Sequence, residues 1–273
     1  MTANNYIRRN AGLFVFLSFF LFWPVALWAG TAEIKVAAAS SMKLVFEEIA
    51  KEFHDENPGI KVKLSFGSSG NFFSQIVHGA PYDVFFSADT NYPRQLVKEG
   101  KSLGDTPVAL YAIGRIVLWV PDSVGLNVKK EKSATLLNSK IIKIAIANPK
   151  HAPYGRAAIE WMNKTGIYSQ VKSRFVLGEN ISQATQFVHT QAAQAGIIAR
   201  SLVTNPEMKS TGSFWEIPTD EHSPIEQGFI ILKGTRNPLV AGSFSEFVTG
   251  PKGSRILKKY GFNIPTIRGR GLL

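Results

Sequence analysis

The chain has 273 residues, contains no cysteine and carries a formal net charge of +11. The absence of cysteine excludes disulfides, thiolate metal sites and a cysteine nucleophile, and we expect no lipid anchor on an N-terminal cysteine. The basic residues are scattered over predicted helices and loops and form no stripe interleaved with aromatic side chains, which argues against a nucleic-acid partner.

Residues 1–32 are predicted to be a secretory signal peptide. Arg8 and Arg9 precede an apolar run from Ala11 to Ala29, and small residues follow this run. A retained membrane anchor is the alternative, because the run is close to the shortest length that spans a bilayer. Pro24 interrupts the run and favours the signal peptide. A soluble exported protein that serves its own cell needs an enclosed compartment, so we expect the periplasm.

Short apolar runs alternate with amphipathic stretches over the first part of the remaining chain. The predicted strands are Ile34–Ala39, Ile60–Phe66 and Asp83–Ser87, and the predicted helices are Met42–Phe53, Phe72–Val77 and Tyr92–Lys98. Strands that alternate with helices predict βαβ units and a mainly parallel sheet.

A long β-rich run from Val108 to Val120, broken by Gly114, separates this series from a second one. The second series comprises strands Lys143–Ala147, Arg174–Leu177 and Gly196–Ala199 and helices Arg156–Lys164 and Ile181–Ala193. A further strand, Gly228–Leu232, and two C-terminal helices, Pro238–Val248 and Gly253–Tyr260, follow it. We therefore predict an α/β fold of two lobes, each a mainly parallel sheet flanked by helices. Residues 33–110, completed by residues 234–273, form the predicted first lobe, and residues 111–233 form the second.

Three polar segments lie where a predicted strand ends and a predicted helix begins. They are Ala38–Ser41, Ser65–Gly70 and Asn148–Gly155. A helix start has unpaired backbone N–H groups and the positive end of the helix dipole, so it attracts anions. Two of the segments are rich in hydroxyl groups and none contains an acid. Together they predict a cage of neutral donors around a small anion, which is a binding site rather than a catalytic one.

These segments resemble those of the periplasmic molybdate-binding proteins of ABC transporters, and the similarity covers essentially the whole chain after the predicted signal peptide. The matching segments, in chain order, are Ile34–Ser40, Ser65–Gly70, Gly79–Asp89, Asn148–Gly155 and Leu257–Phe262. One such segment alone would be a weak signal, whereas five in order with sensible spacing are specific.

The resemblance implies a type II periplasmic binding protein fold with the ligand in the cleft between the lobes. It implies a solute-binding protein, not an enzyme, that captures molybdate and also tungstate and needs no cofactor. The implied partner is an inner-membrane ABC permease, and we expect the protein to be a monomer.

The resemblance also assigns ligand residues. Ser40 and Ser69 are implied to donate hydroxyl and backbone hydrogen bonds, and Tyr154 and Ile181 to donate their backbone N–H groups. These four residues would hold the oxyanion without any direct bond to the metal. Some members of the family add a tyrosine hydroxyl where this chain has Ala199, so one donor is missing here or comes from elsewhere.

Each of these residues also has a purely structural explanation. Ser40 alone is more often a helix N-cap than a ligand, the serines before Gly70 are common in turns, and Tyr154 could simply pack after Pro153. The agreement of five segments in order favours the ligand roles for all of them.

The chemistry of the cage favours an anion without protons. Molybdate, tungstate and sulfate are unprotonated tetrahedral dianions, whereas phosphate near neutral pH keeps a proton that needs an acceptor. A buried polar group without a partner costs about 1–3 kcal/mol, so a cage made only of donors disfavours phosphate. Sulfate differs from molybdate only in size, and a carrier of another oxyanion such as sulfate is therefore the first alternative.

A secreted hydrolase is the alternative from a different class. The chain has five histidines and no G-x-S-x-G motif. His151 lies in the third polar segment and is the one histidine that merits attention as a base. No His, Asp and Glu set has the spacing of metal ligands.

Overall fold

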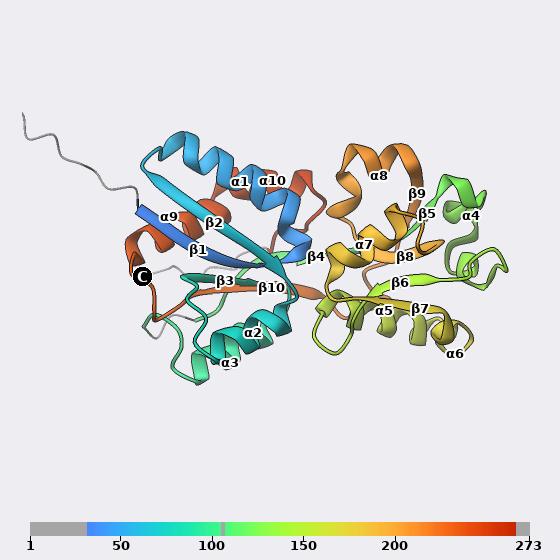
Figure 1. The fold of residues 1–273 in the computed structure, drawn as a ribbon, viewed down its shortest axis with the longest axis horizontal. Helices are drawn as coiled ribbons and strands as arrows, with labels where there is room; N and C mark the ends of the chain where they lie inside the picture. Colours follow the sequence, from blue (N-terminus) through green and yellow to red (C-terminus); the bar gives the residue numbers. More distant parts are fainter. Residues whose placement is uncertain (1–31, 105–106, 266–273) are drawn as a thin grey trace, which may run out of the picture. The chain divides into compact units, whose positions relative to one another are not determined.

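The structure, a computed structural model, describes residues 32–104 and 107–265. These residues form two five-stranded sheets with flanking helices (Figure 1). The predicted signal peptide, residues 1–32, lies outside the described residues except for Ala32. Of the helices described, none combines the length and the apolar character that a membrane span requires.

The first sheet has the strand order β2-β1-β3-β10-β4. Its strands are β1 (Ala32–Ala39), β2 (Ile60–Gly67), β3 (Val84–Ser87), β4 (Ala109–Gly114) and β10 (Ile225–Ile231). β1 pairs in parallel with β2 and β3, whereas β10 runs antiparallel to β3 and β4. The sheet is therefore mixed, with parallel pairing confined to the βαβ units that the sequence predicts.

Helices cover both faces of the first sheet, so its central strands are buried on both sides. The helices α1 (Lys43–Glu56), α9 (Pro238–Thr249) and α10 (Pro251–Lys259) lie on one face, and α2 (Ser69–Val77) and α3 (Asn91–Lys98) lie on the other (Figure 1). Successive side chains of β3 point to opposite faces. Phe86 contacts Phe46 of α1 at 4.9 Å between ring centroids, whereas Phe85 lies 6.4 Å from Phe72 of α2.

The second sheet has the order β7-β6-β8-β5-β9 and is also mixed. Its strands are β5 (Ile116–Pro121), β6 (Ile144–Ala147), β7 (Phe175–Gly178), β8 (Ala195–Ala199) and β9 (Gly212–Glu216). β6 pairs in parallel with β7 and β8, and β5 runs antiparallel to β8 and β9. The edge strand β9 is absent from the sequence prediction, because its five residues are all only partly buried and show no alternation of apolar and polar side chains.

Of the helices beside the second sheet, α5 and α7 are the longest. They are α4 (Val128–Glu131), α5 (Pro153–Lys164), α6 (Tyr168–Val171), α7 (Ile181–His189) and α8 (Pro206–Thr211). Five 3₁₀ helices complete the described elements: η1 (Ser40–Met42), η2 (Asp122–Val124), η3 (Lys132–Leu137), η4 (Lys172–Arg174) and η5 (Leu202–Thr204).

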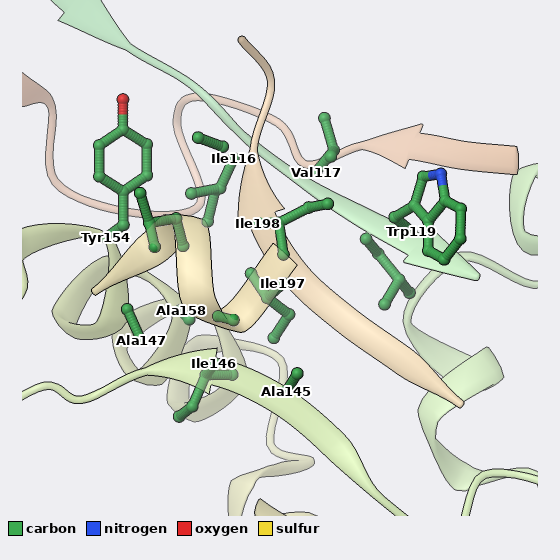
Figure 2. Close-up of a cluster of buried hydrophobic side chains, with 14 of the residues drawn as sticks. Ile116, Val117, Trp119, Ala145, Ile146, Ala147, Tyr154, Ala158, Ile197 and Ile198 are labelled. Carbon is green, nitrogen blue, oxygen red and sulfur yellow. The ribbon is translucent and has the colours of Figure 1, made fainter. Parts of the chain in front are cut away.

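The core of this second half is a continuous apolar cluster between sheet and helices. Figure 2 shows Ile116 and Trp119 of β5, Ile146 of β6 and Ile198 of β8 together with Tyr154 of α5. All five side chains are at most 2 % exposed. The start of α5 is therefore held rigidly against the sheet, and this rigidity fixes the position of the polar segment that precedes it.

The chain crosses between the sheets twice, at Arg115 between β4 and β5 and at residues 217–224 between β9 and β10. We call the residues around the first sheet (32–104, 107–114 and 225–265) the first lobe and residues 115–224 the second lobe. The predicted boundaries at residues 110 and 233 differ from these crossings. Local patterning shows that Val108–Val120 is extended, but sheet membership depends on pairing with distant strands, which the pattern does not encode.

Candidate functional site

The carboxyl ends of the parallel strands face a small cavity between the two lobes. Its volume is ≈ 190 Å³ when the solvent space that continues from it is counted, and it is lined by Ala39, Ser40, Ser41, Gly67, Ser68, Ser69, Ala88, Ala152, Pro153, Tyr154 and Ile181. All four residues predicted as ligands (Ser40, Ser69, Tyr154 and Ile181) are in this lining. The structure thus brings together residues that are up to 141 positions apart in the sequence.

Three helices begin at this cavity, and each presents one backbone N–H to it. Ser69 is the first residue of α2, Ile181 is the first of α7, and Tyr154 follows Pro153 at the start of α5. Within the described residues, the N–H groups of these three residues have no hydrogen-bond acceptor. They belong to the unpaired donors of a helix start and give the cavity a positive potential.

The helix caps explain why these particular N–H groups remain available. The Asn180 side chain accepts from the second and third N–H groups of α7, those of Ser182 and Gln183. Ser68 likewise accepts from Asn71 of α2 at 3.4 Å. A cap serves the second or third N–H and leaves the first unpaired, so the caps of α2 and α7 leave the first N–H of each of these helices to the cavity. The helix α5 has no side-chain cap, and because its first residue, Pro153, has no N–H, Tyr154 carries the first N–H of this helix.

The hydroxyl groups of Ser40 and Ser69 are oriented by backbone donors. Ser69 Oγ accepts from the N–H of Ala88 at 2.9 Å, and Ser40 Oγ accepts from the N–H of Ser182 at 3.3 Å. A hydroxyl has one proton and two lone pairs. Because a lone pair of each oxygen is already engaged by an N–H, the proton is free to be donated to a ligand.

Ser41 is a further serine in the lining, which also includes Ser68, and the sequence analysis did not assign Ser41 to the site. Its side chain is fully buried, and its Oγ has no hydrogen-bond partner within the described residues. The Tyr154 hydroxyl is a near neighbour, but no hydrogen bond of standard geometry joins the two. The Ser40-Ser41 doublet was the available sequence signal, since both hydroxyls stand at the same strand end.

Ala199, at the position where the resemblance implied a tyrosine in some members of the family, lies outside the cavity lining. It is fully buried in β8 and pairs with Ile116 of β5. Among the hydroxyl groups of the described lining, that of Ser41 alone neither donates nor accepts a hydrogen bond.

The lining contains no charged side chain, so its potential comes from oriented dipoles. Arg156, one turn into α5, forms an ion pair with Asp89 of the first lobe. Asp89 also accepts from the N–H of Asn91 at 2.8 Å at the start of α3. Both charges are therefore engaged with each other rather than with the cavity. In the part of the chain that the structure describes, no cluster of histidine and carboxylate residues could hold a metal ion.

The Tyr154 side chain leaves the cavity and enters the first lobe. Its hydroxyl accepts from Gln227 Nε2 at 2.9 Å, and Gln227 Oε1 accepts from the Tyr111 hydroxyl at 2.9 Å. Burial raises the pKa of both tyrosines well above the ordinary value of 10. The two phenols stay protonated at physiological pH and act as structural hydrogen-bonding groups.

His151 contacts Ser68 of the opposite lobe, in an arrangement that superficially resembles a nucleophile and its base. Nδ1 lies 2.9 Å from Ser68 Oγ, and Nε2 lies 3.9 Å from Glu179 Oε2. The second distance exceeds a hydrogen bond, and Ser68 Oγ is also the N-cap of α2 and only 4 % of the residue is exposed. The contact joins the two lobes and offers no accessible nucleophile.

The two mixed sheets and the dipolar cavity between them define a two-lobed binding protein of the type II periplasmic class. Residues 34–263 match the sequence signature of the bacterial extracellular solute-binding proteins, and the chain belongs to this family.

The chain is also similar to individual members of this family whose names state what they bind. The molybdate-binding protein ModA of Azotobacter vinelandii is 38 % identical over 88 % of this chain and 93 % of its own length. ModA of Rhodobacter capsulatus is 37 % identical over 87 % of this chain and 91 % of its own length. The solved structure of the periplasmic molybdate-binding protein of A. vinelandii superposes with a TM-score of 0.79 and 33 % identity, over 85 % of this chain and all of the other. These relatives are solute-binding proteins rather than enzymes, so the hydrolase alternative finds no support among them.

Proposed function

We propose that this protein binds molybdate, and tungstate with it, as the solute-binding component of an ABC transporter. The observation that supports this proposal is the convergence of three unpaired helix-start N–H groups and four serine side chains on one cavity without a carboxylate. Its relatives named ModA are molybdate-binding proteins and match over nearly their whole length.

In this proposal each lobe contributes donors to one oxyanion. Ser40, Ser41 and Ser69 donate from the first lobe, and the N–H groups of Tyr154 and Ile181 donate from the second. Hydrogen bonds from neutral donors to an anion are stronger than those between neutral groups, and the helix dipoles replace a positively charged side chain. The Ser41 hydroxyl takes the place of the tyrosine hydroxyl that some relatives have where this chain has Ala199.

The absence of a carboxylate from the cage favours an anion without protons. A hydrogen phosphate would bring a proton that finds no carboxylate in the lining. One unsatisfied buried group costs about 1–3 kcal/mol, which corresponds to about tenfold to a hundredfold in affinity. Sulfate has no such proton and is rejected by size alone, so its discrimination depends on the fit of the cavity.

The proposal extends to the cell biology of the chain. Residues 1–32 direct export and are then removed, and the mature protein works as a monomer in the periplasm. It delivers the anion to an inner-membrane permease that recognises the closed lobes.

Calorimetric titration of the chain from Glu33 to Leu273 with molybdate, tungstate, sulfate and phosphate tests the proposed ligand. We expect one-to-one binding of molybdate and tungstate, with sulfate and phosphate far weaker. Equal affinity for sulfate would instead identify a general dianion carrier. A folded protein that releases no heat with any of the four anions would contradict the proposed ligand class.

A further inference from the structure

The polar segment 148–155 of the second lobe presents two side chains to the first lobe. Tyr154 reaches the point where β4 and β10 leave the first sheet, because its partner Gln227 lies on β10 and Tyr111 lies on β4. Tyr111, Tyr154 and Gln227 are all at most 3 % exposed. The same residue therefore supplies an N–H to the cavity and a hydroxyl to a buried hydrogen-bond chain at the crossing between the lobes.

Gly114, the last residue of β4, leaves room for the Tyr154 hydroxyl. A Cβ at this position would lie 2.3 Å from the Tyr154 hydroxyl oxygen and 2.9 Å from Gln227 Nε2. Gly114 is not among the glycines with positive φ, so its backbone conformation is open to any residue. The close approach of a side chain from the other lobe is what requires glycine here.

Gly70, in the first turn of α2, leaves room for His151 in the same way as Gly114 leaves room for Tyr154. A Cβ there would lie 2.8 Å from both the Cβ and the carbonyl oxygen of His151. The N–H of Gly70 donates to that carbonyl at 3.0 Å, and His151 Nδ1 lies 2.9 Å from Ser68 Oγ. Gly70 is also outside the set of positive-φ residues. Two glycines of the first lobe thus receive two neighbouring side chains of the second.

We propose that His151 and Tyr154 form a latch that holds the lobes closed, and that Gly70 and Gly114 are required to receive it. The inference deepens the proposed function, because the latch segment also presents the Tyr154 N–H to the anion. Tyr154 and His151 are positioning residues in this scheme. A side chain at Gly114 meets the Tyr154 hydroxyl in the closed arrangement only, since that hydroxyl moves away with the second lobe when the lobes separate, whereas its contact with Gln227 Nε2 lies within the first lobe.

The first test is the affinity of the Gly114→Ala variant for molybdate. Forcing a methyl group into a packed site is destabilising, and a ligand that needs the closed state binds more weakly when that state is less populated. We expect molybdate to bind about tenfold to a hundredfold more weakly, with the change mainly in the dissociation rate. Gly59→Ala is the matched control, because no atom lies within 4 Å of its added Cβ and its φ is not positive.

A double-mutant cycle separates a latch from a general packing defect. Tyr154→Phe removes the oxygen nearest to the added methyl group and leaves Tyr154 Cζ, at 3.0 Å, as the next atom of that side chain. We expect Gly114→Ala to weaken binding less in the Tyr154→Phe background than in the wild type. Strictly additive effects would overturn the latch. Should Gly114→Ala fail to fold, Gly70→Ala in a Tyr92→Phe background tests the contact with His151 by the same affinity measurement, because the Tyr92 hydroxyl, also 2.8 Å from the added Cβ, belongs to the first lobe.

A distance measurement tests the latch without relying on the ligand. The chain has no cysteine, so Lys98→Cys in the first lobe and Ser169→Cys in the second, both exposed positions, can be spin-labelled selectively. Pulsed electron paramagnetic resonance should show a short-distance population, with or without molybdate, that Gly114→Ala reduces and Gly59→Ala retains. A distance distribution that Gly114→Ala leaves unchanged would overturn the latch. So would a wild type that shows no short-distance population either with or without molybdate. A wild type that binds no molybdate would contradict the proposed function, while these distances would still decide on the latch.

Discussion

At the residue scale, the serines of the cavity differ in whether the hydroxyl oxygen already accepts a hydrogen bond. Ser40 and Ser69 each accept a backbone N–H, whereas Ser41 Oγ has no partner within the described residues. Removing the hydroxyl of Ser69 would leave the Ala88 N–H without its acceptor, and stability and binding would then change together. Removing that of Ser41 breaks no described hydrogen bond.

Ser41→Ala is therefore the cleanest test of a ligand role. Loss of one hydrogen bond to an anion costs about 1.5–3 kcal/mol, so we expect molybdate affinity to fall about tenfold to a hundredfold with the melting temperature of the ligand-free protein nearly unchanged. Calorimetric titration and thermal unfolding measure the two quantities. Ser74→Ala, at an exposed position of α2, is the control. Unchanged affinity in Ser41→Ala would exclude the hydroxyl as a donor.

At the element scale, α1 and α10 are joined by three ion pairs along their exposed sides. They are Glu48–Lys259 at 2.7 Å, Glu52–Arg255 at 3.3 Å and Glu56–Lys252 at 2.5 Å. The acids are spaced by four residues and thus share one face of α1. These pairs attach the C-terminal helix to the first lobe, whose strands β1 and β2 end in residues that line the cavity. Each exposed ion pair of this kind contributes little to folding stability. The least exposed pair is therefore the best one in which to measure such a contribution.

Glu48 is the least exposed acid of these three ion pairs. We expect its contribution to folding stability to depend on pH. Burial raises the pKa of its carboxyl, but hydrogen bonds from Lys259 and Tyr260 outweigh burial, and the pKa lies below its ordinary value of 4.5. A lowered pKa stabilises the fold above the pKa of the unfolded state, and this stabilisation is lost as the pH falls through the folded-state pKa.

Glu48→Gln should accordingly lower the free energy of unfolding at pH 7 and make little difference well below pH 4.5. Urea unfolding over this pH range provides the measurement. Glu47→Gln, at an exposed neighbouring position, should change stability less at both pH values. A Glu48→Gln deficit that persists undiminished at low pH would assign the effect to packing rather than to charge.

At the scale of the whole molecule, the two lobes are stabilised against each other by polar contacts around the cavity. Ser182 Oγ donates to the carbonyl of Ser40 at 2.9 Å, and Ser201 Oγ donates to that of Ser41 at 2.7 Å. These bonds tie the second lobe to the segment that lines the anion site. A ligand that bridges both lobes adds to the contacts of the closed form and shifts the population toward it.

The export of the whole chain is open to a direct test. Full-length protein expressed in a two-membrane bacterium should appear in the periplasmic fraction with a mass that corresponds to a start between Gly30 and Glu33, measured by intact mass spectrometry. Replacing Arg8 and Arg9 with glutamate should reduce export, because the basic residues orient the signal peptide. Full-length protein in the membrane fraction would indicate the retained anchor instead.

The sequence by itself determined the features that depend on local chemistry. Apolar periodicity identified the strands and helices of the βαβ units, and the polar segments identified three helix starts, because capping and turn preferences act over a few residues. The four predicted ligand residues were implied by the resemblance to the molybdate-binding family rather than by local signals alone, and the structure places them around one cavity.

Only the tertiary structure decided which strands share a sheet and which donors remain unpaired. β4 and β10 join the first sheet through pairing between residues more than a hundred positions apart, and no local pattern records that choice. Ser41 could not be distinguished from Ser40 in the sequence, since its lack of a partner depends on what the second lobe leaves unbonded. Gly114 likewise is simply a break in a β-rich run until folding brings the Tyr154 hydroxyl against it, because close approach between lobes is a property of the packed chain.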